Sequence, residues 1–364
     1  MARPGDFRLS RATLAGLLAI VLVVGLTAIA LRQPVPYVTF SPGPTVNVLG
    51  KYNKLDIISV SGRESFRDDG ALRLTTVIPS GPDKAKDKVS IPEVVTAWLD
   101  PDRAVYPREA IYPDSATQKS VRDESTAQMD SSQDDAVAAA LRALNIPFKT
   151  GVRIAQVEKG GPADGKLQTG DVVLAVDGTK VQSLEALTRL IRARPVGTEI
   201  TLEVKRKSKV MERRLRTTNS TEDAQESAVR VGIEPCCYDF PFDVDLNLDD
   251  SIGGPSGGLM FALGIYDVLT PGSLTDGKVI AGTGEIDAQG NVGGIGGIQQ
   301  KLVGARSDGA RLFLVPAANC AEVLDSPADP EKMRLVKVTT LEEAIDDVQA
   351  WAKDSDAKLA RCTK

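Results

Sequence analysis

Residues 253–269, which read GGPSGGLMFALGIYDVL, place a serine in a glycine-rich turn directly before an apolar segment with the character of a helix. Glycine lets the backbone turn tightly and lets another chain approach closely. A helix that begins there directs main-chain N–H groups and the positive end of its dipole toward the hydroxyl of Ser256. We therefore predict that Ser256 is exposed at the start of a helix, where an anionic oxygen would be stabilised.

The chain of 364 residues contains no histidine. This excludes Ser-His-Asp and Cys-His catalysis and zinc sites that use histidine. Residues 254–258, GPSGG, match the G-x-S-x-G turn of α/β-hydrolases, but those enzymes need a histidine to take the serine proton, so the match is accidental. A desolvated lysine is the known replacement for that base.

The best candidate for the base is Lys301, which lies 45 residues after Ser256. It follows the glycine-rich stretch at 292–297, VGGIGG, and begins a predicted helix. With an ordinary pKa of about 10.4, only about one lysine in 2,500 is neutral at pH 7. Catalysis therefore requires a site that lowers the pKa by burying the amine among apolar groups.

Residues 253–269, together with 279–301, VIAGTGEIDAQGNVGGIGGIQQK, resemble the proteolytic domain of Lon-type serine proteases. The resemblance covers roughly residues 229–352. It implies that Ser256 is the nucleophile and Lys301 the general base of a Ser-Lys dyad. Such domains commonly assemble into hexameric rings, so the resemblance also implies a homo-oligomer.

The same resemblance assigns supporting roles around the nucleophile. The hydroxyl of Thr283 would steer the lysine. The amide of Ser256 and one amide from Gly253-Gly254 would form the oxyanion hole, since the proline between them has no N–H to donate. The sequence departs from the family at Gly257, where alanine is usual; this change makes the turn more flexible and removes no catalytic group.

A second unit is indicated by residues 151–187, GVRIAQVEKGGPADGKLQTGDVVLAVDGTKVQSLEAL, which resemble a PDZ domain over about 70 residues. PDZ domains bind peptides by adding a strand to a sheet edge and holding the terminal carboxylate in main-chain amides. Lys149-Thr150-Gly151 is a candidate for the carboxylate loop. A small α/β packing module without a ligand is the alternative.

The N-terminal region holds twenty residues without a charge, 12–31, enough for a helix that crosses a bilayer core of about 30 Å. Three arginines precede this segment and only Arg32 follows closely, so we predict a single-pass anchor with the N-terminus in the cytoplasm and the rest outside. A cleaved signal peptide is the alternative, because Ala28-Ile29-Ala30 fits a small-x-small cleavage pattern.

These observations predict a multidomain chain of the α+β and α/β classes. Residues 114–134 are polar and read as a linker or exposed helix start, and 135–144 as a helix. The predicted layout is a cytoplasmic N-terminus (1–11), the transmembrane anchor (12–31), a β-rich segment with linker and helix (32–143), a PDZ domain (144–218), a Lon-like proteolytic domain (226–353) and a polar tail (354–364).

The composition predicts no nucleic-acid partner, because the net charge is -5 with 42% hydrophobic and 26% charged residues. The basic run at 205–216 is better explained as a solvated strand face. Four cysteines, at positions 236, 237, 320 and 362, permit disulfides outside the cytoplasm without proving any. Their spacing and the lack of histidine argue against a metal site, and we expect no metal and no cofactor.

The chain has no G-x-x-x-x-G-K-[ST] motif, so it has no P-loop for nucleotide phosphates. The sequence therefore predicts a membrane-anchored, ATP-independent serine endopeptidase that acts on unfolded or flexible extracytoplasmic proteins. The PDZ domain would select substrates, including those that present a C-terminus. The alternative is an anchored PDZ scaffold with a latent or inactive Lon-like domain. A penicillin-binding or β-lactamase-like enzyme built on Ser355-Asp356-Ala357-Lys358 is disfavoured, because the partner motifs are absent.

Overall fold

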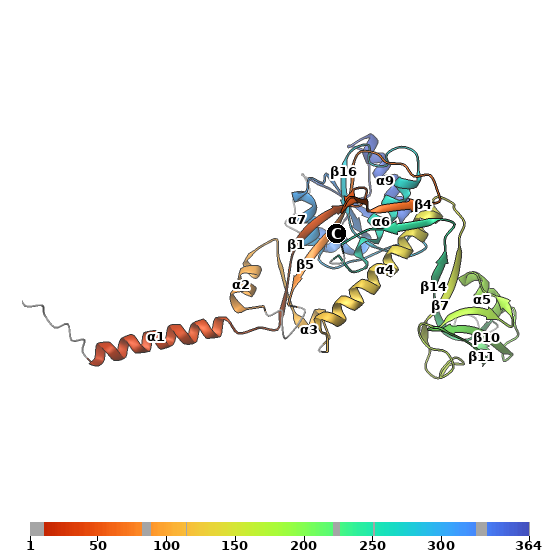
Figure 1. Cartoon of the computed structure of the whole chain (residues 1–364), viewed down its shortest axis with the longest axis horizontal. Helices are drawn as coiled ribbons and strands as arrows, with labels where there is room; N and C mark the ends of the chain where they lie inside the picture. The colour runs from red at the N-terminus through yellow and green to blue at the C-terminus, as the bar shows by residue number, and fades with distance from the viewer. Residues whose placement is uncertain are drawn as a thin grey trace, which may run out of the picture.

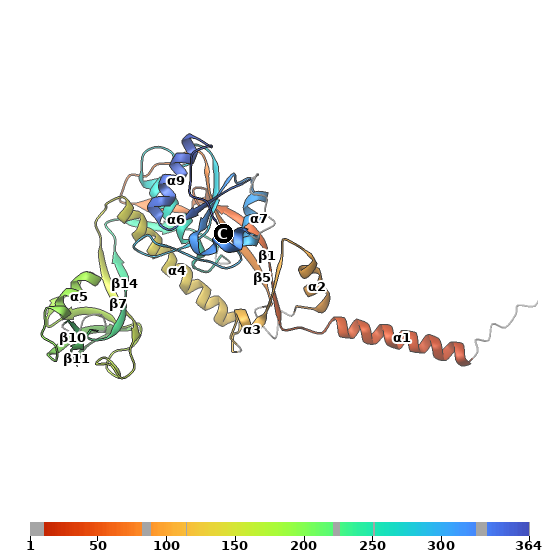
Figure 2. The same ribbon diagram turned by 180° about the vertical axis from the view of Figure 1, so that it is seen from behind.

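The computed structural model describes residues 11–81, 89–113, 115–220, 226–249, 252–324 and 333–363. These residues form a long separate helix, a body built around a mixed sheet, and a smaller unit beside the body (Figure 1). The reverse view shows the smaller unit joined to the body by extended segments (Figure 2).

Helix α1 (Arg11–Leu31) is the apolar segment near the N-terminus. None of its residues is buried against the rest of the protein. Within the described ranges it is the one helix that is long and apolar enough to cross a membrane, and a signal sequence has the same properties.

The body is built on a six-stranded sheet in the order β20, β19, β16, β5, β1, β6. Strands β5, β16, β19 and β20 are parallel, whereas β1 is antiparallel to both β5 and β6. The strands are β1 (Tyr37–Asn47), β5 (Ala71–Ser80), β6 (Ala104–Pro107), β16 (Val279–Gly282), β19 (Leu312–Pro316) and β20 (Arg334–Val338).

Helices cover both faces of this sheet, as parallel strands require. In β19, Leu312 and Leu314 pack in the cluster formed by the helices of one face, while Phe313 and Val315 pack in the cluster of the other. The first face carries α4 (Gln118–Ala143), α6 (Gly258–Leu269) and α9 (Leu341–Lys353), and the second carries α7 (Ile298–Ser307) and α8 (Cys320–Leu324).

The sheet includes strands from the N-terminal part of the chain, which the predicted layout keeps apart from the proteolytic domain. Strands β1, β5 and β6 come from residues 32–143, which the sequence predicted as a separate β-rich segment, yet β5 pairs directly with β16. Alternating apolar residues predict a strand but not its partner, because the partner lies about 200 residues away.

Helix α4 includes most of the stretch predicted as a linker. It begins after Thr117, whose side chain accepts a hydrogen bond from the N–H of Ser120 in a capping box. Its buried face is made largely of small residues such as Ser132, Ala136 and Ala140, so the apolar periodicity that announces most helices is weak here.

The smaller unit has its own six-stranded sheet, in the order β11, β10, β8, β7, β14, with β9 paired to β8. Its last strand, β14, pairs with β7 from Val231↔Val157 to Asp239↔Lys149. This strand lies in the part of the sequence assigned to 226–353, so the unit is completed by residues beyond the predicted boundary at 218. Its elements are β7 (Lys149–Val157), β8 (Val172–Val176), β9 (Thr179–Lys180), α5 (Leu184–Arg192), β10 (Glu199–Arg206), β11 (Lys209–Arg216) and β14 (Val231–Asp239).

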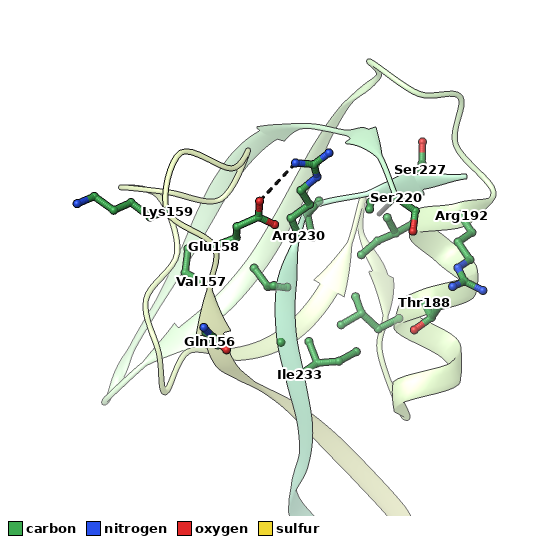
Figure 3. Close-up of a pocket in the computed structure, with 16 residues that line it drawn as sticks. Gln156, Val157, Glu158, Lys159, Thr188, Arg192, Ser220, Ser227, Arg230 and Ile233 are labelled. Atoms are coloured by element: carbon green, nitrogen blue, oxygen red, sulfur yellow. Dashed lines mark hydrogen bonds and ion pairs between the residues drawn. The ribbon is translucent and has the colours of Figure 1, made fainter. Parts of the chain in front are cut away.

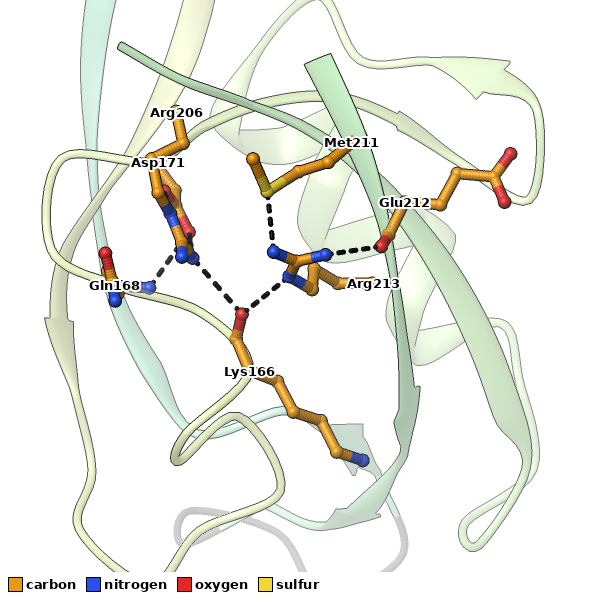
Figure 4. A network of polar contacts seen from close by, with 7 residues as sticks. All are labelled: Lys166, Gln168, Asp171, Arg206, Met211, Glu212 and Arg213. Atoms are coloured by element: carbon orange, nitrogen blue, oxygen red, sulfur yellow. Dashed lines mark hydrogen bonds and ion pairs between the residues drawn. The ribbon is translucent and has the colours of Figure 1, made fainter. Parts of the chain in front are cut away.

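The basic run contributes to the folding of this unit as well as to its surface (Figure 4). Asp171 is fully buried and receives two hydrogen bonds of 2.7 Å from Arg206. Burial raises the pKa of Asp171, but the bonds from Arg206 and Gln168 outweigh it, so the pKa lies below its ordinary value. Arg213 donates to the carbonyl of Lys166 at 3.1 Å. Two arginines of the run are thus structural rather than merely solvated.

Short elements complete the description. They are β2 (Lys51–Tyr52), β3 (Leu55–Asp56), β4 (Ile58–Ser61), α2 (Ile91–Leu99), α3 (Arg108–Ile111), β12 (Thr218–Asn219), β13 (Ser227–Ala228), β15 (Asp243–Leu246), η1 (Pro255–Gly257), β17 (Glu285–Ile286), β18 (Val292–Gly293) and η2 (Ala317–Asn319). Among the cysteines, Cys320 and Cys362 form a disulfide, while Cys236 and Cys237 are free.

Candidate active site

The predicted catalytic residues meet where strand β16 ends. β16 pairs with β5 as far as Gly282↔Leu74, while β5 continues to Ser80 along β1. Helix α6 begins on one face of the sheet and α7 on the other, and both N-termini lie at this carboxyl end. Ligand sites of open α/β sheets form at such ends.

Ser256 lies in the short turn η1, directly before α6. Gly254 precedes it with a φ of +84°, a conformation that L side chains rarely adopt, which explains a glycine at this position. A Cβ on Gly257 would lie 2.8 Å from Leu74 Cδ1 and 3.0 Å from the ring of Phe261. The space that an alanine methyl would occupy is therefore already filled by neighbouring side chains, and flexibility is not what distinguishes this glycine.

One predicted oxyanion donor is engaged elsewhere. The N–H of Gly254 donates to the carbonyl of Ser125 on α4 at 3.0 Å. A Cβ on Gly253 would lie 2.2 Å from Ser125 Oγ, so the turn is closely packed against α4. Of the Gly253-Gly254 pair, Gly254 is therefore unsuited to bind an oxyanion in this conformation.

Lys301 reaches the site from the first turn of α7 and is 2% exposed. Its Nζ lies 2.7 Å from Ser256 Oγ and 2.9 Å from Thr283 Oγ1. Thr283 is fully buried, and its hydroxyl donates to the carbonyl oxygen of Ser256 at 2.9 Å. The structure thus brings together the three side chains that the sequence singled out.

Burial lowers the pKa of Lys301 to about 7, and the carboxylate of Glu285 acts in the opposite direction. Burial also raises the pKa of Glu285, an effect that the charge of Lys301 reduces. A substantial fraction of Lys301 is therefore neutral at pH 7, with a lone pair that can accept a proton. A neutral amine in hydrogen-bond contact with a hydroxyl can act as a general base toward that hydroxyl.

A cavity of about 430 Å³ opens beside Ser256. Its lining includes strand β5 from Leu74 to Pro79, Met129 of α4 and Lys301. The cavity therefore follows strand β5 with Ser256 on its lining, and we call it the trough.

Sequence reasoning missed two contributors to this site. Helix α4 supplies Ser132, whose hydroxyl donates to the carbonyl of Pro255 at 3.0 Å, as well as the acceptor for Gly254. Strand β5 supplies the wall of the trough. No sequence motif marks either element. The capping residues at the start of α4 are the one signal that could have placed the beginning of this helix near residue 118 rather than at 135.

A second cavity, of about 610 Å³, lies in the smaller unit between α5 and β14 (Figure 3). Its apolar lining includes Leu187 and Ile191 from α5 and Val231 and Ile233 from β14. β14 is the last strand in the order of its sheet, so it is an edge strand facing the helix across the groove.

Charged side chains line one end of this groove. Arg230 contacts Glu158 at 3.4 Å, and Lys159 lies nearby on the same loop (Figure 3). Lys149-Thr150-Gly151, the predicted carboxylate loop, instead begins β7 at the opposite end, where Lys149 pairs with Asp239 at 3.2 Å. β7 runs from Lys149 to Val157, so the predicted carboxylate loop and the charged end of the groove lie at opposite ends of this strand.

The described residues contain no group of three or more Cys, Asp or Glu side chains placed to hold a metal ion. None of the three side chains at the site is a typical metal ligand. The three side chains supply two hydroxyls and a buried amine in hydrogen-bond contact.

Two family models match this chain. The PDZ domain model matches residues 122–217, and the model of the Lon protease (S16) C-terminal proteolytic domain matches residues 209–350. The chain therefore carries a PDZ domain and a Lon C-terminal proteolytic domain, as the sequence predicted.

Curated relatives of this chain are Lon proteases, which supports the proteolytic domain. Lon protease of Xanthomonas oryzae pv. oryzae is 32% identical over 128 residues, covering 33% of this chain and 15% of the relative. Lon protease 2 of Bacillus subtilis is 24% identical over 190 residues, covering 52% of this chain and 31% of the relative. The chain thus spans less than a third of the length of these relatives.

Solved structures with a similar segment include isolated PDZ domains. The crystal structure of the PDZ domain of an SdrC-like protein from Listeria monocytogenes is 20% identical, with a TM-score of 0.22. It covers 23% of this chain and 86% of that chain.

Proposed function

Because the chain carries a PDZ domain and a Lon C-terminal proteolytic domain, we propose that it is a serine endopeptidase that works with a Ser-Lys dyad and without ATP. The observation that carries this proposal is the 2.7 Å contact between Lys301 Nζ and Ser256 Oγ, made by a buried lysine. Burying an amine is energetically unfavourable. A catalytic role explains why a buried lysine lies in hydrogen-bond contact with a serine hydroxyl.

In the proposed mechanism, Ser256 Oγ attacks the carbonyl carbon of the scissile bond while neutral Lys301 takes the hydroxyl proton. The lysine then gives this proton to the leaving amine, and an acyl-enzyme on Ser256 remains. Water attacks the acyl carbon with Lys301 again as base, which regenerates the serine. The amide of Ser256 at the start of α6 is the proposed oxyanion donor, with Gly253 in support.

The trough beside β5 fits a substrate in extended conformation. β16 stops at Gly282, so the edge of β5 beyond Leu74 is free of β16 and leads past Ser256. A peptide added along this edge would present its main chain to the nucleophile. Such binding favours unfolded or flexible substrates, because a folded segment cannot lie along a strand edge.

ATP independence rests on the sequence of the chain, which has no P-loop motif. Coupled unfolding by a nucleotide motor would have to come from outside these 364 residues. Selection of already accessible segments is therefore assigned to the PDZ domain, whose groove between α5 and β14 would take a peptide end.

Membrane anchoring through α1 is supported by the surface next to it. Three residues after α1, Pro34 forms a bridge with Ser90, the residue before α2. Trp98 on α2 is 79% exposed. The bridge ties the start of α2 to the segment that follows α1, and an exposed tryptophan on α2 suits a membrane interface. We propose a single-pass anchor that leaves the proteolytic domain outside the cytoplasm.

The structure also informs a proposed domain layout. We assign the PDZ domain to the unit that starts with β7 and ends with β14, inserted between α4 and β15 of the proteolytic body. Residues 37–143 and 243–353 would then form one proteolytic domain. A homo-oligomer, up to a hexameric ring, remains a proposal that rests on the family.

The test compares the full chain in detergent with Ser256→Ala and Lys301→Ala on casein, without ATP. The dyad predicts that both variants lose cleavage while keeping their circular dichroism spectra and a cooperative melting transition. Cleavage that persists in Ser256→Ala would assign the chemistry to another site. No cleavage by the native chain, combined with no labelling of Ser256 by a fluorophosphonate, would favour a PDZ scaffold with a latent domain.

A further inference from the structure

Two adjacent thiols lie in the strand that joins the PDZ groove to the proteolytic body. Cys236 and Cys237 belong to β14, three residues after Ile233 of the groove lining. Beyond them, Tyr238 donates a hydrogen bond of 2.6 Å to Asp135 on α4 of the body. The two cysteines therefore occupy the passage between the domains, where β7 and β14 run side by side (Figure 1).

The backbone at this point turns both thiols to the same side. In a regular strand, adjacent side chains point to opposite faces. Here the pairing with β7 shifts between Cys236 and Asp239, a bulge, and Cys237 has a φ of +54°. As a result the two Sγ atoms lie 2.6 Å apart. A bulge combined with a left-handed residue is the local distortion that lets neighbouring cysteines meet.

The two thiols differ in their surroundings. Cys237 is exposed and lies near the guanidinium of Arg153 on β7. An exposed thiol can be reached by a disulfide in solution, whereas a buried one cannot. Cys236 is buried, and burial together with its contact to Cys237 raises its pKa to about 12. The exposed thiol is thus placed to react first and the buried one to resolve.

We propose that Cys236 and Cys237 form a reversible thiol–disulfide site that exchanges with small or protein disulfides at the junction of the two domains. The thiolate of Cys237 attacks a disulfide RSSR and forms a mixed disulfide, with RS⁻ leaving. Cys236 then attacks Cys237 Sγ, loses its proton to solvent and releases the second RS⁻. The protein dithiol is oxidised to a vicinal disulfide and RSSR is reduced to two thiols.

We expect the disulfide between Cys236 and Cys237 to be reduced more easily than the disulfide between Cys320 and Cys362. Adjacent Cα atoms are about 3.8 Å apart across a trans peptide, shorter than the roughly 4.4–6.8 Å of most disulfides. Closing the ring therefore strains the backbone, and strained or exposed disulfides are the easily reduced ones. The outcome is a bond that forms in an oxidising environment and opens again under mild reductant.

The test treats the full chain in detergent with oxidised glutathione, quenches with a thiol alkylator, and maps the peptide that holds both cysteines by mass spectrometry. The proposal predicts that this peptide loses two hydrogen atoms and carries no alkyl group or glutathione. It also predicts that mild dithiothreitol restores double alkylation while Cys320–Cys362 stays closed. Alkylation of both thiols after oxidation would overturn it, as would glutathione left stably on Cys237.

Variants separate the two roles and keep the proposal testable. Cys236→Ser should stop at a mixed disulfide on Cys237, because no resolving thiol remains. Cys237→Ser should leave Cys236 slow to react, because that thiol is buried. Arg189→Gln, an exposed arginine on α5, is the control and should react like the native chain. Equal reaction rates of the remaining thiol in Cys236→Ser and Cys237→Ser would refute the assignment of Cys237 as the first to react.

Discussion

The hydroxyl of Thr283 donates a hydrogen bond of 2.9 Å to the main-chain carbonyl oxygen of Ser256. This bond uses the single proton of Thr283 Oγ1, so only its lone pairs can face Lys301 Nζ at 2.9 Å. The lysine must then donate to Thr283, which leaves the lone pair of the neutral amine for the hydroxyl of Ser256. The nucleophile's own carbonyl thus helps to set the direction in which the base points.

Replacement of Thr283 by valine tests this positioning. Valine keeps the shape but cannot accept from Lys301, so we expect kcat to fall by about 10- to 100-fold while KM changes little. Thr283→Ser keeps the hydroxyl and should retain most of the activity. Steady-state kinetics on a fluorogenic peptide measure both. A fall confined to KM in Thr283→Val would mean that the threonine shapes the substrate site instead.

The pH dependence follows from the pKa of Lys301, which is lowered to about 7. The protonated amine cannot accept a proton, so kcat/KM should rise with pH through about 7 and level off above about pH 8. Glu285 raises this pKa, so Glu285→Gln should shift the profile to lower pH. Glu342→Gln, on an exposed position of α9, is the control and should leave the profile in place. A flat profile between pH 6 and 9 contradicts a lysine base.

The positions of the candidate site residues could be predicted because each lies in a local pattern. Ser256 is in a glycine-rich turn before an apolar helix, and Lys301 begins the next helix after a second glycine-rich stretch. Thr283 follows directly on a short buried strand, and its role is implied by the resemblance to Lon-type domains alone. Local patterns of this kind place side chains at the ends of strands and helices, which is where such sites form.

The surroundings of the site could not be predicted, because they depend on contacts between distant segments. β5 belongs to the body because it pairs with β16. α4 packs on the nucleophile turn, where its Ser125 carbonyl accepts a hydrogen bond from Gly254. The PDZ domain separates α4 from β15 in the sequence, while the body remains continuous in space. Residue patterns report burial and secondary structure but carry no information on these long-range partners.

Replacement of Lys301 by methionine should stabilise the protein while abolishing activity. A pKa lowered from 10.5 to about 7 corresponds to a loss of about 4 kcal/mol in the free energy of unfolding at pH 7. Methionine removes this penalty but also two hydrogen bonds of about 1 kcal/mol each, so a net gain of about 2 kcal/mol is expected.

The sign of this effect depends on pH in a defined way. The folded pKa of Lys301 lies below the unfolded value, so the penalty is complete below about pH 7 and fades as the pH approaches about 10.5. In thermal unfolding, Lys301→Met should therefore melt above the native chain at pH 7, equal it near about pH 9 and melt below it near pH 10, where the penalty has faded and only the loss of the two hydrogen bonds remains. A variant that melts lower than the native chain at pH 7 would refute the penalty.

Ser132 offers a test of the contact between α4 and the nucleophile turn. Its buried hydroxyl donates to the carbonyl of Pro255, so Ser132→Ala leaves that acceptor without its partner at a cost of about 1–2 kcal/mol. We expect faster hydrogen exchange in residues 253–258 and a several-fold lower kcat/KM. Ser131→Ala, the exposed neighbour on the same helix, should change neither. Unchanged exchange in Ser132→Ala would mean that α4 does not hold the turn.

The groove between α5 and β14 should distinguish peptides by their C-terminus. Its apolar lining suits an apolar last side chain, and Arg230 at one end could pair with a terminal carboxylate in place of Glu158. A peptide ending in valine with a free carboxylate should bind more tightly than its amide by about tenfold, measured by fluorescence anisotropy on Ser256→Ala to prevent cleavage. Arg230→Gln should reduce this difference, whereas Arg214→Gln, an exposed arginine of β11, should preserve it. Equal binding of acid and amide would show that the groove reads internal segments, because the carboxylate would then make no contact of its own.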